Sequence, residues 1–191
     1  NNFNNLVFAS ENLQNDKEVV MTALEINGDA LQYANERFRG DRNVIESVIR
    51  KFPYALRFAK PELRRDLNFV NKLVKVNGLS LASVAENLKQ NREVVMNAIK
   101  QNPAALEHVS PILQTTDFII DVMEMNGNAL AHVSYDIWLV LDPQDQIDIV
   151  MAAVTKNGEA LMWHYMFSGN LNANRNIVMA AVSQNGLALR Y

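Results

Sequence analysis

The residues that could carry out chemistry in this chain are few, and their spacing forms no recognisable catalytic motif. There is no His-Glu-x-x-His metal motif, no Gly-x-Ser-x-Gly nucleophile motif and no glycine-rich phosphate-binding loop. The chain also lacks cysteine, which excludes disulfides and thiolate metal sites. We therefore predict no catalytic, cofactor-binding or metal-binding residues, and a protein that is not an enzyme.

The histidines are better explained by packing than by catalysis. His108 and His132 both lie two residues after a leucine that recurs through the chain, and His164 lies one position away from that place. Other copies have mostly aromatic residues at the same position: Tyr33, Phe58, Ser83, Trp163 and Tyr191. The pattern indicates one structural position for ring-bearing side chains.

Basic residues gather in one part of the chain and form the best candidate binding surface. Residues 37–100 hold fourteen Lys/Arg against six Asp/Glu, whereas residues 101–191 hold three against nine. The candidate patch consists of Arg50, Lys51, Arg57, Lys60, Arg64 and Arg65. Two interpretations stay open: a surface that binds phosphate groups or an acidic protein, or a solvated face whose charges pair with Glu46, Glu62, Asp66 and Glu86.

A short motif recurs through the chain and defines a repeat. Five copies contain Asn-Gly, and the marker positions are Asn27, Phe52, Asn77, Asn102, Asn126, Asn157 and Asn185. A leucine always lies four residues after the marker, and a small residue precedes that leucine. Successive markers lie 25, 25, 25, 24, 31 and 28 residues apart. We predict about seven repeats of about 25 residues in one domain that spans residues 1–191.

Each repeat contains the pattern of a pair of helices. Polar residues suited to an N-cap open the repeats: Asp16, Asp41, Asp66, Asn91, Thr115 or Thr116, Asp145 and Asn174. Apolar residues follow at i, i+1, i+4 and i+5, which is helical spacing and not strand alternation. A second, shorter apolar stripe follows the marker, and then one further helical turn. Short helices are marginal alone but bury a core when stacked, so we predict an all-α, solenoid-like array of helical hairpins.

Two features of this pattern concern single positions. Met21, Met96, Met151 and Met179 share one position of the first helix, and we expect them to fill the core rather than form a binding stripe. The position after the marker holds glycine or proline, so it marks a break between helices. Two interpretations of the glycine copies stay open: glycine can end the first helix in a left-handed cap, or the asparagine before it, such as Asn27, can cap the second helix. Proline is expected to begin the second helix, with Asn102 as the N-cap before Pro103.

The late repeats carry extra residues. Residues 135–144 add about six, and Asp142-Pro143 there is typical of an N-cap followed by the first helical position. Residues 167–169 add about three more. Insertions in solenoids often lie on a binding face, but we favour a longer second helix or a divergent terminal repeat.

These segments resemble a known family. The stretches DKEVVMTALEINGDALQYANE, NREVVMNAIKQNPAALEHVS and NIVMAAVSQNGLALRY are similar to the helical repeat family called domain of unknown function 4116. The departures are Phe52-Pro53, Pro103, residues 138–144 and residues 162–172. The resemblance implies modules of multidomain proteins from protists, their viruses and intracellular bacteria, including secreted effectors. It implies no activity and no catalytic residues.

The remaining features of the sequence indicate where in the cell the protein is expected. No apolar run approaches the ~20 residues that span a bilayer. There is no basic-then-apolar leader and no initiator methionine, so we expect a piece of a longer protein. The absence of cysteine favours a reducing compartment: the cytoplasm, or the host cytosol for an effector.

Together these observations predict a non-catalytic helical-repeat scaffold for protein–protein or interdomain interaction. Its partner would be another protein or a flanking domain of the same chain. The alternative is a phosphate-directed module that binds anionic lipid or RNA through the basic second and third repeats. Nucleic acid is disfavoured, because RNA-reading repeats need a reading position along most of the array and the basic character here reverses sign.

Overall fold

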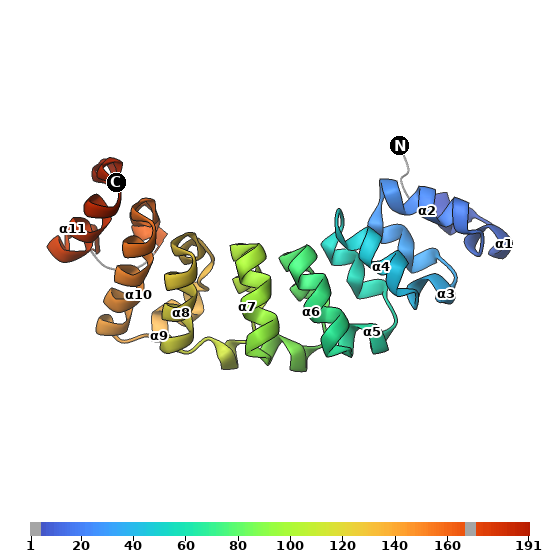
Figure 1. The fold of residues 1–191 in the computed structure, drawn as a ribbon, viewed down its shortest axis with the longest axis horizontal. Coiled ribbons are helices and arrows are strands. Elements are labelled where there is room, and N and C mark those ends of the chain that lie inside the picture. Colours follow the sequence, from blue (N-terminus) through green and yellow to red (C-terminus); the bar gives the residue numbers. More distant parts are fainter. Residues whose placement is uncertain (1–4, 167–170) are drawn as a thin grey trace. The chain divides into compact units, whose positions relative to one another are not determined.

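The computed structural model describes residues 5–166 and 171–191, and within those ranges it describes the side chains of all residues except 5 and 164–166. Every regular element in the described residues is a helix, so the all-α prediction is confirmed. The chain forms two compact units, residues 1–101 and residues 102–191 (Figure 1). The prediction of one domain over residues 1–191 stays a prediction. The predicted extra residues at 167–169 lie outside the described residues.

Unit 1 repeats a set of three helices. The first helices are α2 (Lys17–Ile26), α4 (Arg42–Ile49), α6 (Leu67–Val76) and α7 (Arg92–Gln101). The second are short 3₁₀ helices: η1 (Asn5–Phe8), η2 (Gly28–Tyr33), η3 (Pro53–Phe58) and η4 (Gly78–Ser83). The third are α1 (Glu11–Gln14), α3 (Glu36–Arg39), α5 (Pro61–Arg65) and η5 (Glu86–Gln90).

Unit 2 continues the same order of elements. Its first helices are α8 (Thr116–Met125), α10 (Pro143–Lys156) and α11 (Arg175–Gln184). Its second helices are η6 (Pro103–His108), η8 (Gly127–His132), η9 (Gly158–Met166) and η11 (Gly186–Arg190). Its third helices are η7 (Pro111–Leu113), α9 (Tyr135–Val140) and η10 (Leu171–Ala173). The helical repeat array is therefore present in both units.

Most predicted N-caps form. The side chains of Asp16, Asp41, Asp66, Asn91, Thr115 and Asn174 accept hydrogen bonds from backbone N–H groups in the first turns of their helices. Asp145 is wrong as an N-cap, because α10 begins earlier, at Pro143. Proline is favourable at the first helical position, so Asp142-Pro143 starts the helix and Asp145 lies within its first turn. Asp145 instead accepts a hydrogen bond from the Thr116 hydroxyl, 3.0 Å away.

The marker asparagine makes the corner between the first and second helices. Asn27, for example, has extended φ and ψ of −148° and 115°, ends α2 and caps η2. Its side-chain oxygen accepts a hydrogen bond from the Asp29 N–H. None of the described glycines has a left-handed φ, so of the two alternatives the asparagine N-cap forms and the left-handed glycine cap does not. The predicted Asn102 N-cap before Pro103 is confirmed.

Glycine follows the marker because the next repeat comes very close. A Cβ atom placed on Gly78 would lie 2.2 Å from the carbonyl oxygen of Ala98 in α7. In unit 2, a Cβ on Gly158 would lie 2.3 Å from the carbonyl oxygen of Ala181. A side chain at these positions would have to push the neighbouring first helix away. Close backbone approach, and not a special φ, explains the glycine.

The core is built from the repeated positions. The repeated leucines Leu31, Leu56, Leu81, Leu106, Leu130 and Leu161 are all at most 2% exposed. The small residue before each of them is buried too, which allows the second helices to pack closely. In unit 1, a backbone ladder also joins third helices to the next repeat: the N–H groups of residues 35, 60 and 85 donate to the carbonyls of residues 14, 39 and 64.

Candidate functional site

The two repeated histidines lie in unit 2 at the ends of second helices. Both are half-buried, at the end of η6 for His108 and of η8 for His132. The His132 Nδ1 lies 2.6 Å from Oε1 of Glu107, a residue of the preceding repeat. No group of three or more potential metal ligands occurs in the part of the chain that the structure describes. The position therefore joins neighbouring repeats.

Most of the candidate basic patch in unit 1 is engaged within the protein. Arg57 binds the carboxylate of Asp29 over 2.9 Å, and Lys60 lies 3.4 Å from a carboxylate oxygen of Glu36. Nearby, Arg50 lies 3.8 Å from Glu46. Lys51 donates to the backbone carbonyl of Glu25 over 2.7 Å and also lies over the Phe52 ring. The patch is therefore largely paired, but among the described residues only Glu46 of the carboxylates expected from the sequence pairs with it, and Asp29 and Glu36 take the place of the others.

Arg64 and Arg65 are the exceptions. The structure gives neither of them an ion pair with any described residue, and the Arg64 Nε is buried without a hydrogen-bond acceptor. Both line a hollow of about 400 Å³ between α5 and η5, together with Glu86 and Asn87. Lys51 lines a different hollow, between α2 and α4. No described hollow therefore gathers the six predicted residues into one site.

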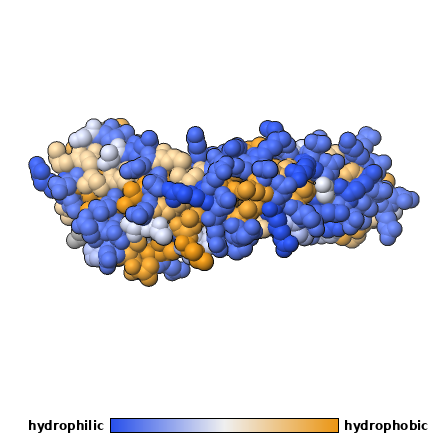
Figure 2. Space-filling view, turned by 60° about the horizontal axis from the view of Figure 1, so that its bottom comes forward, coloured by the Kyte–Doolittle hydropathy of each residue, from blue (hydrophilic) through white to orange (hydrophobic). Residues whose placement is uncertain are grey.

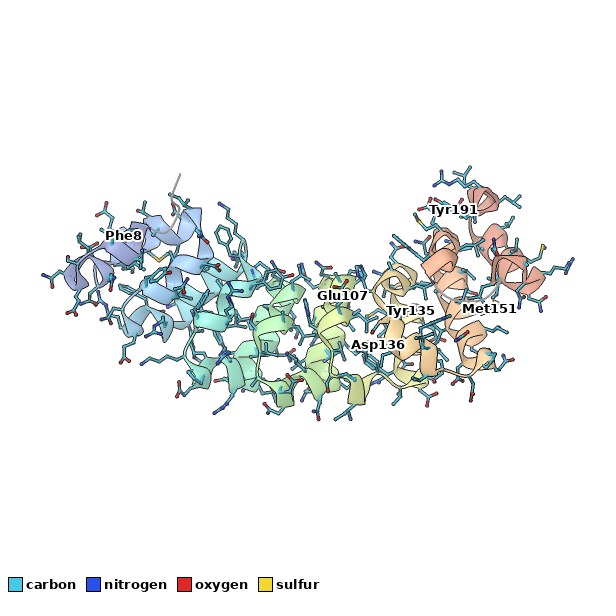
Figure 3. The ribbon with its side chains drawn as sticks, turned by 180° about the vertical axis from the view of Figure 1, so that it is seen from behind. Phe8, Glu107, Tyr135, Asp136, Met151 and Tyr191 are labelled. Carbon is cyan, nitrogen blue, oxygen red and sulfur yellow. The ribbon has the colours of Figure 1, made fainter. Side chains whose placement is uncertain are left out.

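The methionine position lies outside the core, and two of its four residues, Met21 and Met151, line described grooves. Met21, Met96 and Met151 are half-exposed, and Met179 is 49% exposed, so the core-filling prediction is wrong. The Val-Val pair and the alanine of the first helix already fill the interior, which leaves methionine on the outer face. Met151, labelled in Figure 3, belongs to α10. It lines a groove of about 500 Å³ between α8 and α10. Apolar Ile120 and the carboxylates Glu124 and Asp148 share this groove.

The largest departure from the repeat pattern is an exposed apolar surface in unit 2. We call it the α9 surface: Tyr135, Leu139 and Val140 on α9, with Ile112 on η7. Tyr135 and Leu139 are each 54% exposed, Ile112 is 77% exposed and Val140 is 80% exposed. Figure 2 shows apolar atoms gathered on the part of unit 2 that holds these two elements.

Trp138 holds this surface in place from beneath. It is fully buried, and its backbone carbonyl accepts a hydrogen bond from the Gln146 side chain of α10 over 3.0 Å. With one face of the short helix anchored by Trp138, the neighbouring residues Leu139 and Val140 project outward. Asp136 within α9 and Asp142 just after this helix are both exposed, and Figure 3 labels Asp136 near the start of α9.

Sequence reasoning located the insertion but missed this surface. The signal was present in the repeat itself, because the position of Ile112 holds a polar residue in five other copies: Asn12, Arg37, Glu62, Asn87 and Asp136. A large apolar residue at a position that is mostly polar indicates a role other than folding. Among the described residues, no helix is long and apolar enough to cross a membrane.

Comparison with known proteins adds the family and nothing on activity. A family model described as a domain of unknown function, DUF4116, matches residues 1–39, 41–89, 68–114 and 146–191. The unmatched residues 115–145 contain α9. No curated protein and no solved structure matches the chain. Because the matched segments cover most of its length, the chain belongs to the DUF4116 family.

Proposed function

We propose that this chain is a non-catalytic helical-repeat scaffold that binds a partner protein, or another domain of its own longer chain, through the α9 surface. The observation that supports this is the exposure of Ile112, Leu139 and Val140 on neighbouring third helices, with Ile112 at a position that is polar in five other copies. Contiguous exposed apolar patches on soluble proteins are characteristic of interaction sites. The α9 part of the surface lies in residues 115–145, which the family model does not match, as expected for a partner-specific feature, whereas Ile112 lies in a matched segment.

The charge around the surface indicates the chemistry of the partner. Asp136 on α9 and Asp142 just after it are exposed, and residues 101–191 hold nine acidic residues against three basic ones. A partner segment with apolar side chains flanked by Lys or Arg would match both features, because complementary charge speeds association and fixes orientation. Apolar contacts with Leu139 and Val140 would supply most of the affinity.

A peptide-display selection tests this proposal. The whole chain is used to select binders from a random peptide library, and the wild type is compared with a Leu139→Glu/Val140→Glu variant. The expected result is enrichment of peptides with apolar and basic residues by the wild type, and loss of their binding to the variant. Circular dichroism establishes that the variant is folded.

A Leu187→Glu/Leu189→Glu variant is the matched control. These two leucines are 65% and 71% exposed, lie in the same unit and receive the same change of charge. The selected peptides should bind this control as well as they bind the wild type. Equal loss in both variants would assign the effect to net charge. Loss in the control alone would move the binding surface to η11, and either outcome would overturn the role of the α9 surface.

We propose, as a second candidate function, that unit 1 binds phosphate groups of anionic lipids at Arg64 and Arg65. The hollow beside these residues and their lack of acidic partners favour it. Phosphatidylserine vesicles should then sediment the wild type in a salt-dependent way, and an Arg64→Glu/Arg65→Glu variant should bind less. Arg57→Glu/Lys60→Glu is the control with equal charge change. If the wild type does not bind the vesicles, or if both variants bind them equally, this function is excluded. RNA binding is measured in parallel, and RNA binding without vesicle binding would identify RNA and not lipid as the phosphate source.

A further inference from the structure

The five Asn-Gly corners share one geometry. In each corner, the Asn side-chain Oδ1 accepts a hydrogen bond from the N–H of the residue two positions later, over 2.9 to 3.3 Å. The asparagines are Asn27, Asn77, Asn126, Asn157 and Asn185. Asn102 makes the same bond over 3.0 Å, but Pro103 follows it. All six corners therefore contain the same hydrogen bond to the asparagine side chain. The residue after the asparagine is glycine in five of them and proline in the sixth.

This arrangement favours a known reaction of asparagine. The glycine nitrogen loses its proton to a base in water and bonds to the asparagine Cγ, and Nδ2 leaves as ammonia after taking up a proton. Water then opens the resulting cyclic imide at either carbonyl, which gives aspartate or isoaspartate. Negative charge develops on Oδ1 during the attack, and the N–H that already donates to Oδ1 would stabilise it, as donors of an oxyanion hole do.

What differs among the corners is the glycine N–H. The Gly78 N–H donates to Oε1 of Gln101 over 2.5 Å, and the Gly158 N–H donates to Oε1 of Gln184 over 2.6 Å. Each glutamine lies at the end of the next first helix. A base in water reaches these N–H groups only after the glutamine has moved away.

Two other corners have lysine where that glutamine would be. Lys51 and Lys156 occupy the equivalent positions after Gly28 and Gly127, and an ammonium group has no lone pair to accept a hydrogen bond. Both glycines are buried, but no described residue accepts a hydrogen bond from the Gly28 or Gly127 N–H, so a local opening exposes the group without breaking such a bond. The Gly186 N–H has no described acceptor either, and a Cβ atom on Gly186 would meet nothing within 4 Å.

We propose that Asn27, Asn126 and Asn185 are sites of spontaneous deamidation in the folded chain, and that Gln101 and Gln184 protect Asn77 and Asn157. Pro103 has no N–H, so Asn102 cannot react by this route. The sequence Asn-Gly is common to all five sites, and the residue that the next repeat supplies sets which of them reacts.

The modification has a structural consequence at Asn126. Isoaspartate adds one carbon to the main chain at the corner. There the structure has little room, because a Cβ on Gly127 would already lie 2.3 Å from the carbonyl oxygen of Ala153. The isoaspartate form of this corner should displace α10 from α8 and loosen unit 2. Asn126 would thus link the age of the protein to the packing of this unit.

Timed incubation of the folded chain at mildly alkaline pH tests the proposal. Proteolysis and mass spectrometry then give the fraction of aspartate and isoaspartate at each site. Asn27, Asn126 and Asn185 should convert several-fold faster than Asn77 and Asn157, and Asn102 should stay unchanged. In concentrated urea the five Asn-Gly sites should react at similar rates. Equal rates in the folded chain, or fastest conversion at Asn77 or Asn157, would overturn the proposal.

A variant isolates the role of the glutamine. Gln184→Leu removes the acceptor while keeping a side chain of similar size, and it should accelerate conversion at Asn157 several-fold without changing Asn27. Gln144→Leu is the control, because Gln144 bonds to Asp148 and not to a glycine. An unchanged rate at Asn157 in a folded Gln184→Leu protein would contradict protection. If the variant is unfolded, the deamidation rates of the folded and the urea-treated wild type still test whether the fold sets which asparagines react.

Discussion

Arg57 in η3 binds Asp29 in the corner of the preceding repeat, with 2.9 Å between Nη2 and Oδ2. In unit 2, Arg190 and Glu159 occupy the same two repeat positions and lie 3.9 Å apart. A charge on one repeat thus neutralises an opposite charge on its neighbour. Several cations of the basic segment serve this purpose, including Lys60 with Glu36.

Loss of the Arg57 pair should have a small effect on stability. Both side chains are about half exposed, so water and salt screen their attraction. Arg57→Met should lower the free energy of unfolding by less than about 1 kcal/mol. Urea titrations at low and high salt measure it, and the difference from wild type should shrink in high salt. A salt-independent loss would show that packing of Arg57 over Phe58 matters more.

Glycine at the corner should be required only where a neighbour approaches. Gly158→Ala should lower the free energy of unfolding by about 1–3 kcal/mol, because the new methyl group would meet the Ala181 carbonyl. Gly186→Ala is the matched control, since nothing lies within 4 Å of its Cβ position. It should be neutral, or stabilising by up to about 1 kcal/mol through the unfolded state. Equal destabilisation by both changes would refute the close-approach explanation.

Asp66 should contribute a pH-dependent part of the stability. The hydrogen bond from the Phe69 N–H, and then that from Arg42, lowers the pKa of its carboxyl group. Because the folded-state pKa is below the unfolded-state value, the ionised group stabilises the fold above about pH 3.9, and this contribution is lost as pH falls through the folded-state pKa. Asp66→Asn keeps an N-cap residue but removes the titration, so unfolding free energy should fall less steeply in acid than in wild type.

The Arg42→Met variant separates the two causes at Asp66. It removes the guanidinium but leaves the Phe69 N–H, so the acid dependence should weaken only in part. NMR titration of the Asp66 carboxyl group in this variant should give a pKa between those of wild-type and unfolded chain. An unchanged titration would mean that Arg42 contributes nothing.

Trp138 should contribute strongly to the stability of the fold, whereas its exposed neighbours should contribute little. Because it is fully buried, Trp138→Ala should lower the free energy of unfolding by about 3–5 kcal/mol. Leu139→Ala removes an exposed side chain and should change it by less than about 0.5 kcal/mol. Urea denaturation measures both. A large cost for Leu139→Ala would show that the α9 surface belongs to the core and is not free to bind.

The repeat could be predicted because its information is local. Each part of the repeat signal acts within about one helical turn: the apolar spacing around Val19 and Val20, the capping residue Asp16 and the repeated Leu31. The absence of catalytic motifs could be read from the sequence in the same way. The basic patch could be named from composition, but composition does not tell which carboxylate lies opposite each cation.

The sequence by itself determined the helices, their approximate ends and the positions that form the core. Only the tertiary structure decided why glycine follows Asn157, because the cause is the Ala181 carbonyl of the next repeat. It also decided that Met151 lines a groove and that Leu139 and Val140 face outward. Periodicity specifies which face of a helix is apolar, whereas exposure depends on how closely neighbouring repeats pack and on which face Trp138 anchors.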